Sequence, residues 1–413
     1  MTWRNFAAMT AALLVLACKD SPTDDGDDRG PDPGPAIQLA VLGNGGVPER
    51  YTSEVAVAGD WVYTGTWNIR GTASGNTPGN ALKIWNASGG TPVLADSVII
   101  PGAGTVSDVQ LSHDNALLVL SIEGGTLNRG ISIYDRNPAN PAKPTLLSRY
   151  STTLTSTGVH TVKLGRINNR HYAFLSVNQG GGSPSRLIIV DLTDPVNPVQ
   201  VYTAPMGGPF IHDVAIRDGI LFAALWEQGL RIFDVGGGGR GGTPSDPVVM
   251  GNIVTVNGKV HNVNWFHDPK TGSKRYAFIG EETPASPNYT GDIHVVDVSN
   301  FTAPREVGFF RVAGAGAHNF ALDEASGILY AAFYVGGVRA LDIRGDLENC
   351  AAAEKAPDGR CDLGLMKRER AIGLNDRGIP VSIWGVAISG NALYASDMWN
   401  GLWRLDITQL KRP

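Results

Sequence analysis

Short apolar runs, each closed by Asp or Asn, recur along the chain at intervals of roughly 40 to 65 residues. Runs of this length rich in Ile, Val and Leu indicate buried β-strands. Several are followed by a Pro-rich turn, as in Asp194–Pro198, which ends the strand. The seven runs are Ala81–Asn86, Gly130–Asp135, Arg186–Asp191, Gly229–Asp234, Asp292–Asp297, Gly337–Asp342 and Gly401–Asp406.

Each run has three further short strands around it. In the third unit the four expected strands begin at His160, Tyr172, Leu187 and Val199. Four short strands in each of seven units predict an all-β fold, a seven-bladed β-propeller of four-stranded blades over residues 37–413. The last unit ends at Thr408 without an outer strand. We expect Ile37–Leu42 to supply that strand and close the ring, which would remove the open sheet edges.

The run Leu187–Asp191, followed by Asp194–Pro195 and Pro198, resembles the motif that names the LVIVD-repeat family of bacterial exported proteins. The resemblance implies a propeller without implying one activity, because this fold carries many unrelated functions. The chain departs from the pattern at three places, which are Asn86 in place of Asp, the Gly236–Gly242 stretch, and an insert over residues 344–380.

Histidines head four consecutive units. The corresponding places in the other units hold Ser53 or Glu54, Ser107 and Asp108, and Trp384. If these residues begin the innermost strands, four imidazoles point toward one mouth of the central channel. Chance does not explain this placement, although duplication of one ancestral histidine would. The four are His160, His212, His261 and His318.

The second strand of each unit should end at the same mouth, where Glu123, Glu227 and Glu281 occur. Imidazoles surrounded by carboxylates fit a site for Fe, Cu or Zn, with the carboxylates orienting the rings or acting as bases. The constellation is similar to the four-histidine iron centre of the carotenoid-cleaving oxygenases, which are also seven-bladed. The competing interpretation is structural: each imidazole then only bonds a loop of a neighbouring blade. The other four histidines are expected to be structural.

Four aromatic residues are expected near the same mouth and would line a pocket there. Packing between blades is the alternative role for such side chains. They are Trp226, Tyr334, Trp384 and Trp399.

The N-terminus reads as an export signal. Arg4 precedes an apolar run too short to span a bilayer, and Val15–Cys18 resembles a bacterial lipobox, so residues 1–18 are expected to be a signal peptide with lipid on Cys18. Plain secretion is the alternative. The acidic, Pro- and Gly-rich residues 19–36 are expected to be a disordered tether. Lys19 lacks the Asp that, by resemblance to enterobacterial lipoproteins, would retain the protein at the inner membrane, so an outer-membrane or cell-surface location is expected.

Composition narrows the classes of function that fit the chain. A net charge of -5 and a pI near 5.9 argue against nucleic-acid binding. The protein is separately expected to be a monomer. Cys350 and Cys361 are expected to form a disulfide, because exported chains meet an oxidising compartment. The leading interpretation is a lipid-anchored propeller that binds a small molecule or protein partner at the channel mouth. The alternatives are a metal-dependent oxidative or hydrolytic enzyme with a four-histidine centre, and a purely structural surface protein.

Overall fold

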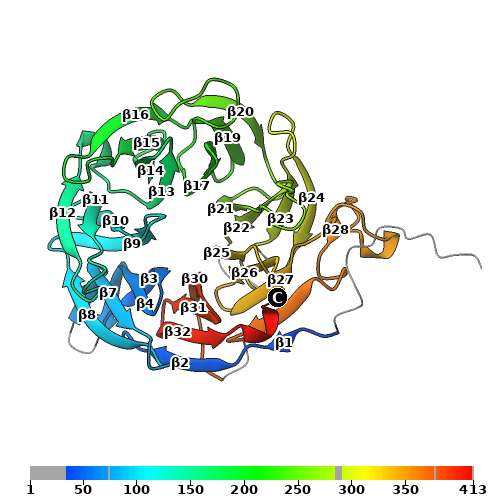
Figure 1. The fold of residues 1–413 in the computed structure, drawn as a ribbon, viewed down its shortest axis with the longest axis horizontal. Coiled ribbons are helices and arrows are strands. Elements are labelled where there is room, and N and C mark those ends of the chain that lie inside the picture. Colours follow the sequence, from blue (N-terminus) through cyan, green and yellow to red (C-terminus); the bar gives the residue numbers. More distant parts are fainter. Residues whose placement is uncertain (1–33, 73–74, 284–290, 376–377, 412–413) are drawn as a thin grey trace, which may run out of the picture.

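The computed structural model describes residues 34–72, 75–283, 291–375 and 378–411. Nearly all regular structure in them is β-strand, and the sheets stand side by side around a common centre in a propeller-like arrangement (Figure 1). The segment expected to be a signal peptide, including Cys18, and most of the expected tether lie outside the described residues. Within the described ranges, no helix is long and apolar enough to cross a membrane.

Residues 51–253 form four groups of four antiparallel strands, of which the first two are joined into one eight-stranded sheet by the pairing of β4 with β9. Their first strands lie nearest the centre in Figure 1. The groups are β3 (Tyr51–Ala58), β4 (Trp61–Trp67), β7 (Ala81–Asn86) and β8 (Val93–Ile99); β9 (Ala103–Leu111), β10 (Leu117–Gly125), β11 (Gly130–Asp135) and β12 (Thr145–Tyr150); β13 (Thr161–Ile167), β14 (Arg170–Val177), β15 (Arg186–Asp191) and β16 (Val199–Pro205); β17 (Asp213–Arg217), β18 (Ile220–Ala224), β19 (Leu230–Asp234) and β20 (Val248–Ile253).

The second half continues the pattern with three groups. They are β21 (Val260–Trp265), β22 (Tyr276–Glu281), β23 (Ile293–Asp297) and β24 (Arg305–Phe310); β25 (Phe320–Asp323), β26 (Ile328–Ala332), β27 (Val338–Asp342) and β29 (Glu369–Gly373); β30 (Ile383–Ser389), β31 (Ala392–Asp397), β32 (Gly401–Asp406) and β2 (Val41–Gly45). Outside the groups lie β1 (Ile37–Gln38), β28 (Cys361–Asp362), the hairpin β5 (Ile69–Thr72) and β6 (Gly75–Pro78), and the 3-10 turns η1 (Thr153–Thr155), η2 (Ala352–Glu354) and η3 (Thr408–Leu410).

The second strand of each group is apolar on both faces because neighbouring groups pack against both sides. Along β14, Tyr172 and Phe174 join a core cluster with Leu221 of the next group. The alternate residues Ala173 and Leu175 join a cluster with Val119 of the preceding group. The two-residue period of a strand therefore divides one continuous apolar run between two cores. All seven apolar runs form the third strand of their group, as the repeat predicts.

The Asp that closes each run has a local task. In Asp191 the Oδ1 atom accepts hydrogen bonds from the backbone N–H and the hydroxyl of Thr193, at 2.8 and 2.5 Å. The same pattern joins Asp297 to Ser299. These bonds turn the chain after the third strand, since Asp readily caps a turn two residues ahead. Asn86 does the same for Ser88, so this departure from the motif keeps its function.

The glycine-rich stretch after β19 wraps around the carboxylate of Asp234. Five backbone N–H groups, between Gly236 and Gly242, donate to its two oxygens at 2.7 to 3.2 Å. Burial would raise the pKa of Asp234, but these donors lower it strongly. The glycines allow this close approach, since a Cβ on Gly242 would lie 2.0 Å from the carbonyl oxygen of Asp234 and a Cβ on Gly238 would lie 2.9 Å from its Cγ.

The N-terminal segment Ile37–Leu42 divides between two sheets. Ile37 and Gln38 (β1) pair in parallel with β29. The outer strand on β32 is β2, shifted toward the C-terminus relative to the expectation, with Val41 opposite Leu405 and Gly45 opposite Leu402. Val62 and Trp85 of the first group share a core cluster with Tyr394 and Leu402 of the last. The first and last groups therefore pack against each other.

The segment expected as an insert, residues 344–380, contains the outer strand of the sixth group. β29 pairs with β27 there, so the extra polypeptide lies before Glu369. A disulfide joins Cys350 to Cys361 as expected, with their Cα atoms 6.0 Å apart. From Cys361 the chain pairs in parallel with β24. Arg360 reaches Glu306 of that strand, so the extra segment is fastened along the outer edge of the fifth group.

Candidate metal centre

The four histidines lie where the innermost strands begin. His160 and His212 immediately precede β13 and β17, His318 lies two residues before β25, and His261 is the second residue of β21. The backbone N–H of each of the first three donates to the second strand of its own group, with the acceptor carbonyls on Ser176, Ala224 and Ala332. Equivalent backbone positions therefore aim the side chains at the same end of the channel.

The imidazoles form one contiguous row. Ring centroids are 4.4 Å apart for His160 and His212, 3.9 Å for His212 and His261, and 4.1 Å for His261 and His318. The Nε2 atoms of His160 and His212 lie 3.1 Å apart. The structure thus brings together all four histidines that the repeat pattern singles out.

A carboxylate that the sequence analysis did not select lies against this row. Oε2 of Glu282 is 3.3 Å from Nε2 of His212 and 3.8 Å from Nε2 of His261. Its other oxygen accepts a hydrogen bond of 2.5 Å from the hydroxyl of Tyr334. Among the described residues, ligand atoms of His212, His261 and Glu282 all lie within 4.8 Å of one another.

Two of the histidines have partners on the ring nitrogen that faces away from the row. Nδ1 of His160 lies 2.9 Å from Oε2 of Glu123, and Nδ1 of His318 bonds the backbone oxygen of Trp384. By contrast, Nδ1 of His212 and both ring nitrogens of His261 are buried and have no hydrogen-bond partner. His261 is 1% exposed, so these unpaired nitrogens are costly unless a ligand binds them.

Burial and neighbouring charge separate the histidine pKa values. Burial lowers the pKa of His212, and the charge of His160 adds to that effect. Burial lowers the pKa of His261 well below its usual value and that of His318 to about 4. Burial also acts to lower the pKa of His160, but Glu123 outweighs it and the net pKa is raised.

The two carboxylates at the row stay ionised. Burial would raise the pKa of Glu282, but its bond to His212 and the neighbouring imidazoles bring it well below the usual value. The pKa of Glu123 is likewise lowered by His160 against the effect of burial. Three imidazoles with depressed pKa values beside anionic oxygens are a donor set in the protonation state that metal binding requires.

Two of the three carboxylates expected at this site do not reach it. Glu281 is completely buried, with Oε2 3.5 Å from Nε2 of His294, because it is still part of β22 and points into the sheet packing. Glu227 is exposed in a turn. Aligning the units by structure pairs Glu282 with Trp226 and Tyr334, each two residues past an alanine or glycine of its second strand. Matching the units at this position would have selected Glu282 as the residue that faces the histidines.

Three of the four expected aromatic residues line the row. Trp226 stacks on His212, with centroids 5.4 Å apart and an interplanar angle of 18°. Tyr334 and Trp384 lie 4.9 and 4.5 Å from His318. Trp399 has no ring contact with the histidines. The sequence analysis missed Trp67, at the end of β4, whose ring is 5.9 Å from His160 and 5.2 Å from Trp384.

A cavity of about 20 Å³ lies among these side chains. Such a volume suits one water molecule or one ion. Its walls include the head-of-unit residues Glu54 and Ser107 as well as the histidines and Trp384. The Nε2 atoms of His160 and His212 lie 3.1 Å apart. If each were about 2.1 Å from one ion, the N–ion–N angle would be roughly 95°. Imidazole nitrogens with a carboxylate oxygen fit Zn, Cu or Fe.

Comparison with known proteins supports the repeat and the fold. The LVIVD repeat family matches residues 286–312 and 382–411. The chain carries LVIVD repeats. No curated protein matches it. Among solved structures it is similar to Saccharomyces cerevisiae Sqt1, a WD40-like propeller, with a TM-score of 0.54 and 9% identity over 91% of this chain and 88% of that one. This likeness shows a propeller-like fold and carries no functional argument.

Proposed function

We propose that the protein binds a transition-metal ion at the mouth of its channel, with His212, His261 and Glu282 as ligands and His160 and His318 beside them. The observation that carries this proposal is the position of Glu282. Its carboxylate faces two buried imidazoles, whose ring nitrogens include three without any partner. A purely structural histidine would have its nitrogens satisfied within the protein.

The surrounding residues are suited to hold such ligands in place. Glu123 fixes the orientation of His160, and the carbonyl of Trp384 fixes that of His318. Tyr334 engages one oxygen of Glu282 and leaves the other facing the imidazoles. Partners of this kind set the tautomer and direction of a metal ligand. A bound ion would supply positive charge that the anionic Glu282 and Glu123 complement.

We propose that the scaffold is a seven-bladed propeller closed by β2. The antiparallel pairing of β2 with β32 and the core cluster shared by the first and last groups support closure. We also propose export with lipid attached at Cys18, from the lipobox-like Val15–Cys18 and the acidic segment after it. Cys18→Ala should move the protein from the membrane to the soluble fraction, and unchanged fractionation would contradict the anchor.

The test of metal binding is elemental analysis by mass spectrometry of purified protein before and after loading with Zn²⁺, Co²⁺ or Cu²⁺. We expect near-stoichiometric metal in the wild type and its loss in His212→Ala/His261→Ala. His113→Ala, which removes an exposed histidine away from the site, should bind metal normally. A folded wild type that stays free of metal after loading would overturn the proposal.

A second candidate function, a metal-dependent enzyme, is favoured by a pocket of about 400 Å³ next to the site. Its walls include Ile69 and Pro78 of the β5–β6 hairpin and Glu123, which bonds His160. A catalytic ion keeps an open position for substrate. The visible spectrum of the Co²⁺-loaded protein should then change on adding azide. A spectrum unaffected by azide would favour a closed, non-catalytic site.

A further inference from the structure

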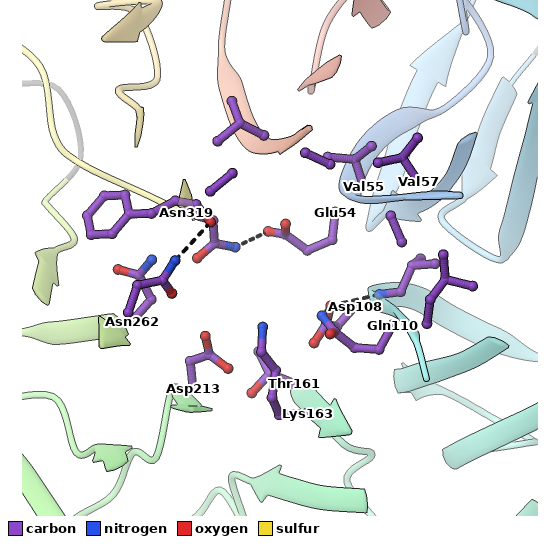
Figure 2. Close-up of a pocket in the computed structure, with 18 of the residues that line it drawn as sticks. Glu54, Val55, Val57, Asp108, Gln110, Thr161, Lys163, Asp213, Asn262 and Asn319 are labelled. Carbon is purple, nitrogen blue, oxygen red and sulfur yellow. Dashed lines mark hydrogen bonds between the residues drawn. The ribbon is translucent and has the colours of Figure 1, made fainter. Parts of the chain in front are cut away.

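A second, larger cavity of about 300 Å³ adjoins the cavity at the histidine row and shares Glu54, Asp213 and Asn319 with its lining. We name it the channel chamber and define it by Glu54, Asp108, Lys163, Asp213, Asn262 and Asn319. These side chains come from different sheets and converge on one space (Figure 2). Lys163 is only half-buried, so solvent reaches the chamber.

One of the chamber's carboxylates is already used by the fold. Asp108 accepts hydrogen bonds from Val109 and Gln110 through Oδ1 and from the backbone of Val162 through Oδ2. It therefore ties β9 to β13. Its charge is satisfied by the protein, and it needs no ligand.

The other charged groups are left open. Within the described ranges, Lys163 forms no direct ion pair or hydrogen bond, although its charge acts on Asp213 and Glu54 from a longer distance. Asp213 has one oxygen bonded to the backbone of Val214, and its other oxygen has no partner among the described residues. Glu54, with only 9% exposure, uses Oε1 to accept from Asn319 and points across the chamber (Figure 2). Oδ1 of Asn319 is buried without a partner.

Such an arrangement does not suit a second metal ion. No group of three metal-ligating atoms close enough to share an ion is found there among the described residues. An ammonium group and two carboxylates that leave each other unpaired instead offer separate places for a negative and a positive group. Opposite charges in one partly desolvated cavity bind best when both find a partner.

We propose that the channel chamber binds a small zwitterion of amino-acid size, with its ammonium group between Glu54 and Asp213 and its carboxylate on Lys163. The amides of Asn262 and Asn319 line the same space and can bond either end of such a ligand. A volume of about 300 Å³ lies at the lower end of the range for small-molecule pockets.

The test is isothermal titration calorimetry of the full, chelator-treated protein, so that it does not depend on metal binding. The probes are unbranched ω-amino acids from glycine to 6-aminohexanoate, which vary the distance between the two charges. n-Butylamine and butyrate serve as single-charge controls. We expect one chain length to bind at least about tenfold more tightly than either control, since a charged hydrogen bond contributes roughly that much.

Lys163→Met, which keeps the alkyl stem, should weaken binding of that amino acid at least tenfold while leaving butylamine binding unchanged. Asp213→Asn keeps the oxygen bonded to Val214 and should weaken both. Lys143→Met removes a surface lysine paired with Asp96 and should change nothing. The proposal is overturned if no probe binds the folded wild type, if butylamine binds as tightly as every amino acid, or if Lys163→Met has no effect.

Discussion

The hydroxyl of Tyr334 donates a hydrogen bond of 2.5 Å to Oε1 of Glu282. Tyr334 adopts a left-handed backbone conformation (φ 44°), unusual for an aromatic residue, and its backbone forms a bridge with Ile383 of the next group. The phenol is thereby directed at the carboxylate from the neighbouring group. Tyr334 acts as a positioning residue for the proposed ligand.

Tyr334→Phe keeps the ring and removes only this bond. We expect metal affinity to fall about tenfold, since loss of a partner that orients a ligand typically costs 10- to 100-fold. The measurement is competition for Zn²⁺ against a chromophoric chelator. Tyr63→Phe, which removes a hydroxyl bonded to the carbonyl of Pro141, is the matched control. Equal affinity in both variants would remove Tyr334 from the site.

The adjacent glutamates Glu281 and Glu282 should give opposite results. Glu282→Gln removes the anionic oxygen that faces His212 and His261. The metal affinity of the protein should therefore fall at least about 100-fold while the fold persists. Glu281→Gln should leave metal stoichiometry unchanged and lower thermal stability instead, because Glu281 is buried beside His294. Elemental analysis and thermal unfolding of both variants decide the assignment. Loss of metal in the Glu281 variant alone would reverse it.

Asp234 should stabilise its loop more than the equivalent Asp191 does. Five backbone N–H groups donate to Asp234, whereas Asp191 accepts from the N–H and hydroxyl of Thr193 and pairs with the exposed Arg170. Replacing Asp234 by Ala should lower the free energy of unfolding by about 2–3 kcal/mol, and Asp191→Ala by about 1 kcal/mol. Urea denaturation measures both. Equal losses would show that water replaces the missing acceptor in the glycine loop.

The repeat placed most of this architecture in advance. The third strand of each group could be predicted because a short apolar run closed by Asp is a local property of the sequence. The convergence of the four histidines could be predicted because each lies at the head of a unit. The division of Ile37–Leu42 between two sheets could not be predicted from the sequence. It depends on whether each residue reaches the edge of β29 or that of β32.

The errors at the site have a physical origin in register. Consecutive residues at a strand end point in different directions. The sequence analysis chose Glu281, whose side chain is buried in the sheet packing, instead of Glu282, whose side chain faces the histidines. The contact between Glu282 and His212 also depends on distances across the channel, which no local pattern contains. The same holds for the unpaired Lys163, whose surroundings come from several sheets.

His294 makes stability depend on pH. It is fully buried in β23, with Nδ1 2.7 Å from Glu306 and Nε2 3.5 Å from Glu281. Burial acts to lower its pKa, but these two carboxylates raise it to about 9. Arg360 also contacts Glu306, and it remains charged throughout this pH range.

Because the folded pKa of His294 lies above the unfolded value of about 6.5, the folded state binds the extra proton between these two values. Its contribution is therefore complete below about pH 6.5 and is lost as the pH rises through about 9. We expect the free energy of unfolding to fall by about 3 kcal/mol over this interval. Urea denaturation at a series of pH values measures the slope, and NMR titration of the His294 ring assigns it. A ring pKa below 6.5 would contradict the buried charge, since the slope from this residue would then be absent above pH 6.5.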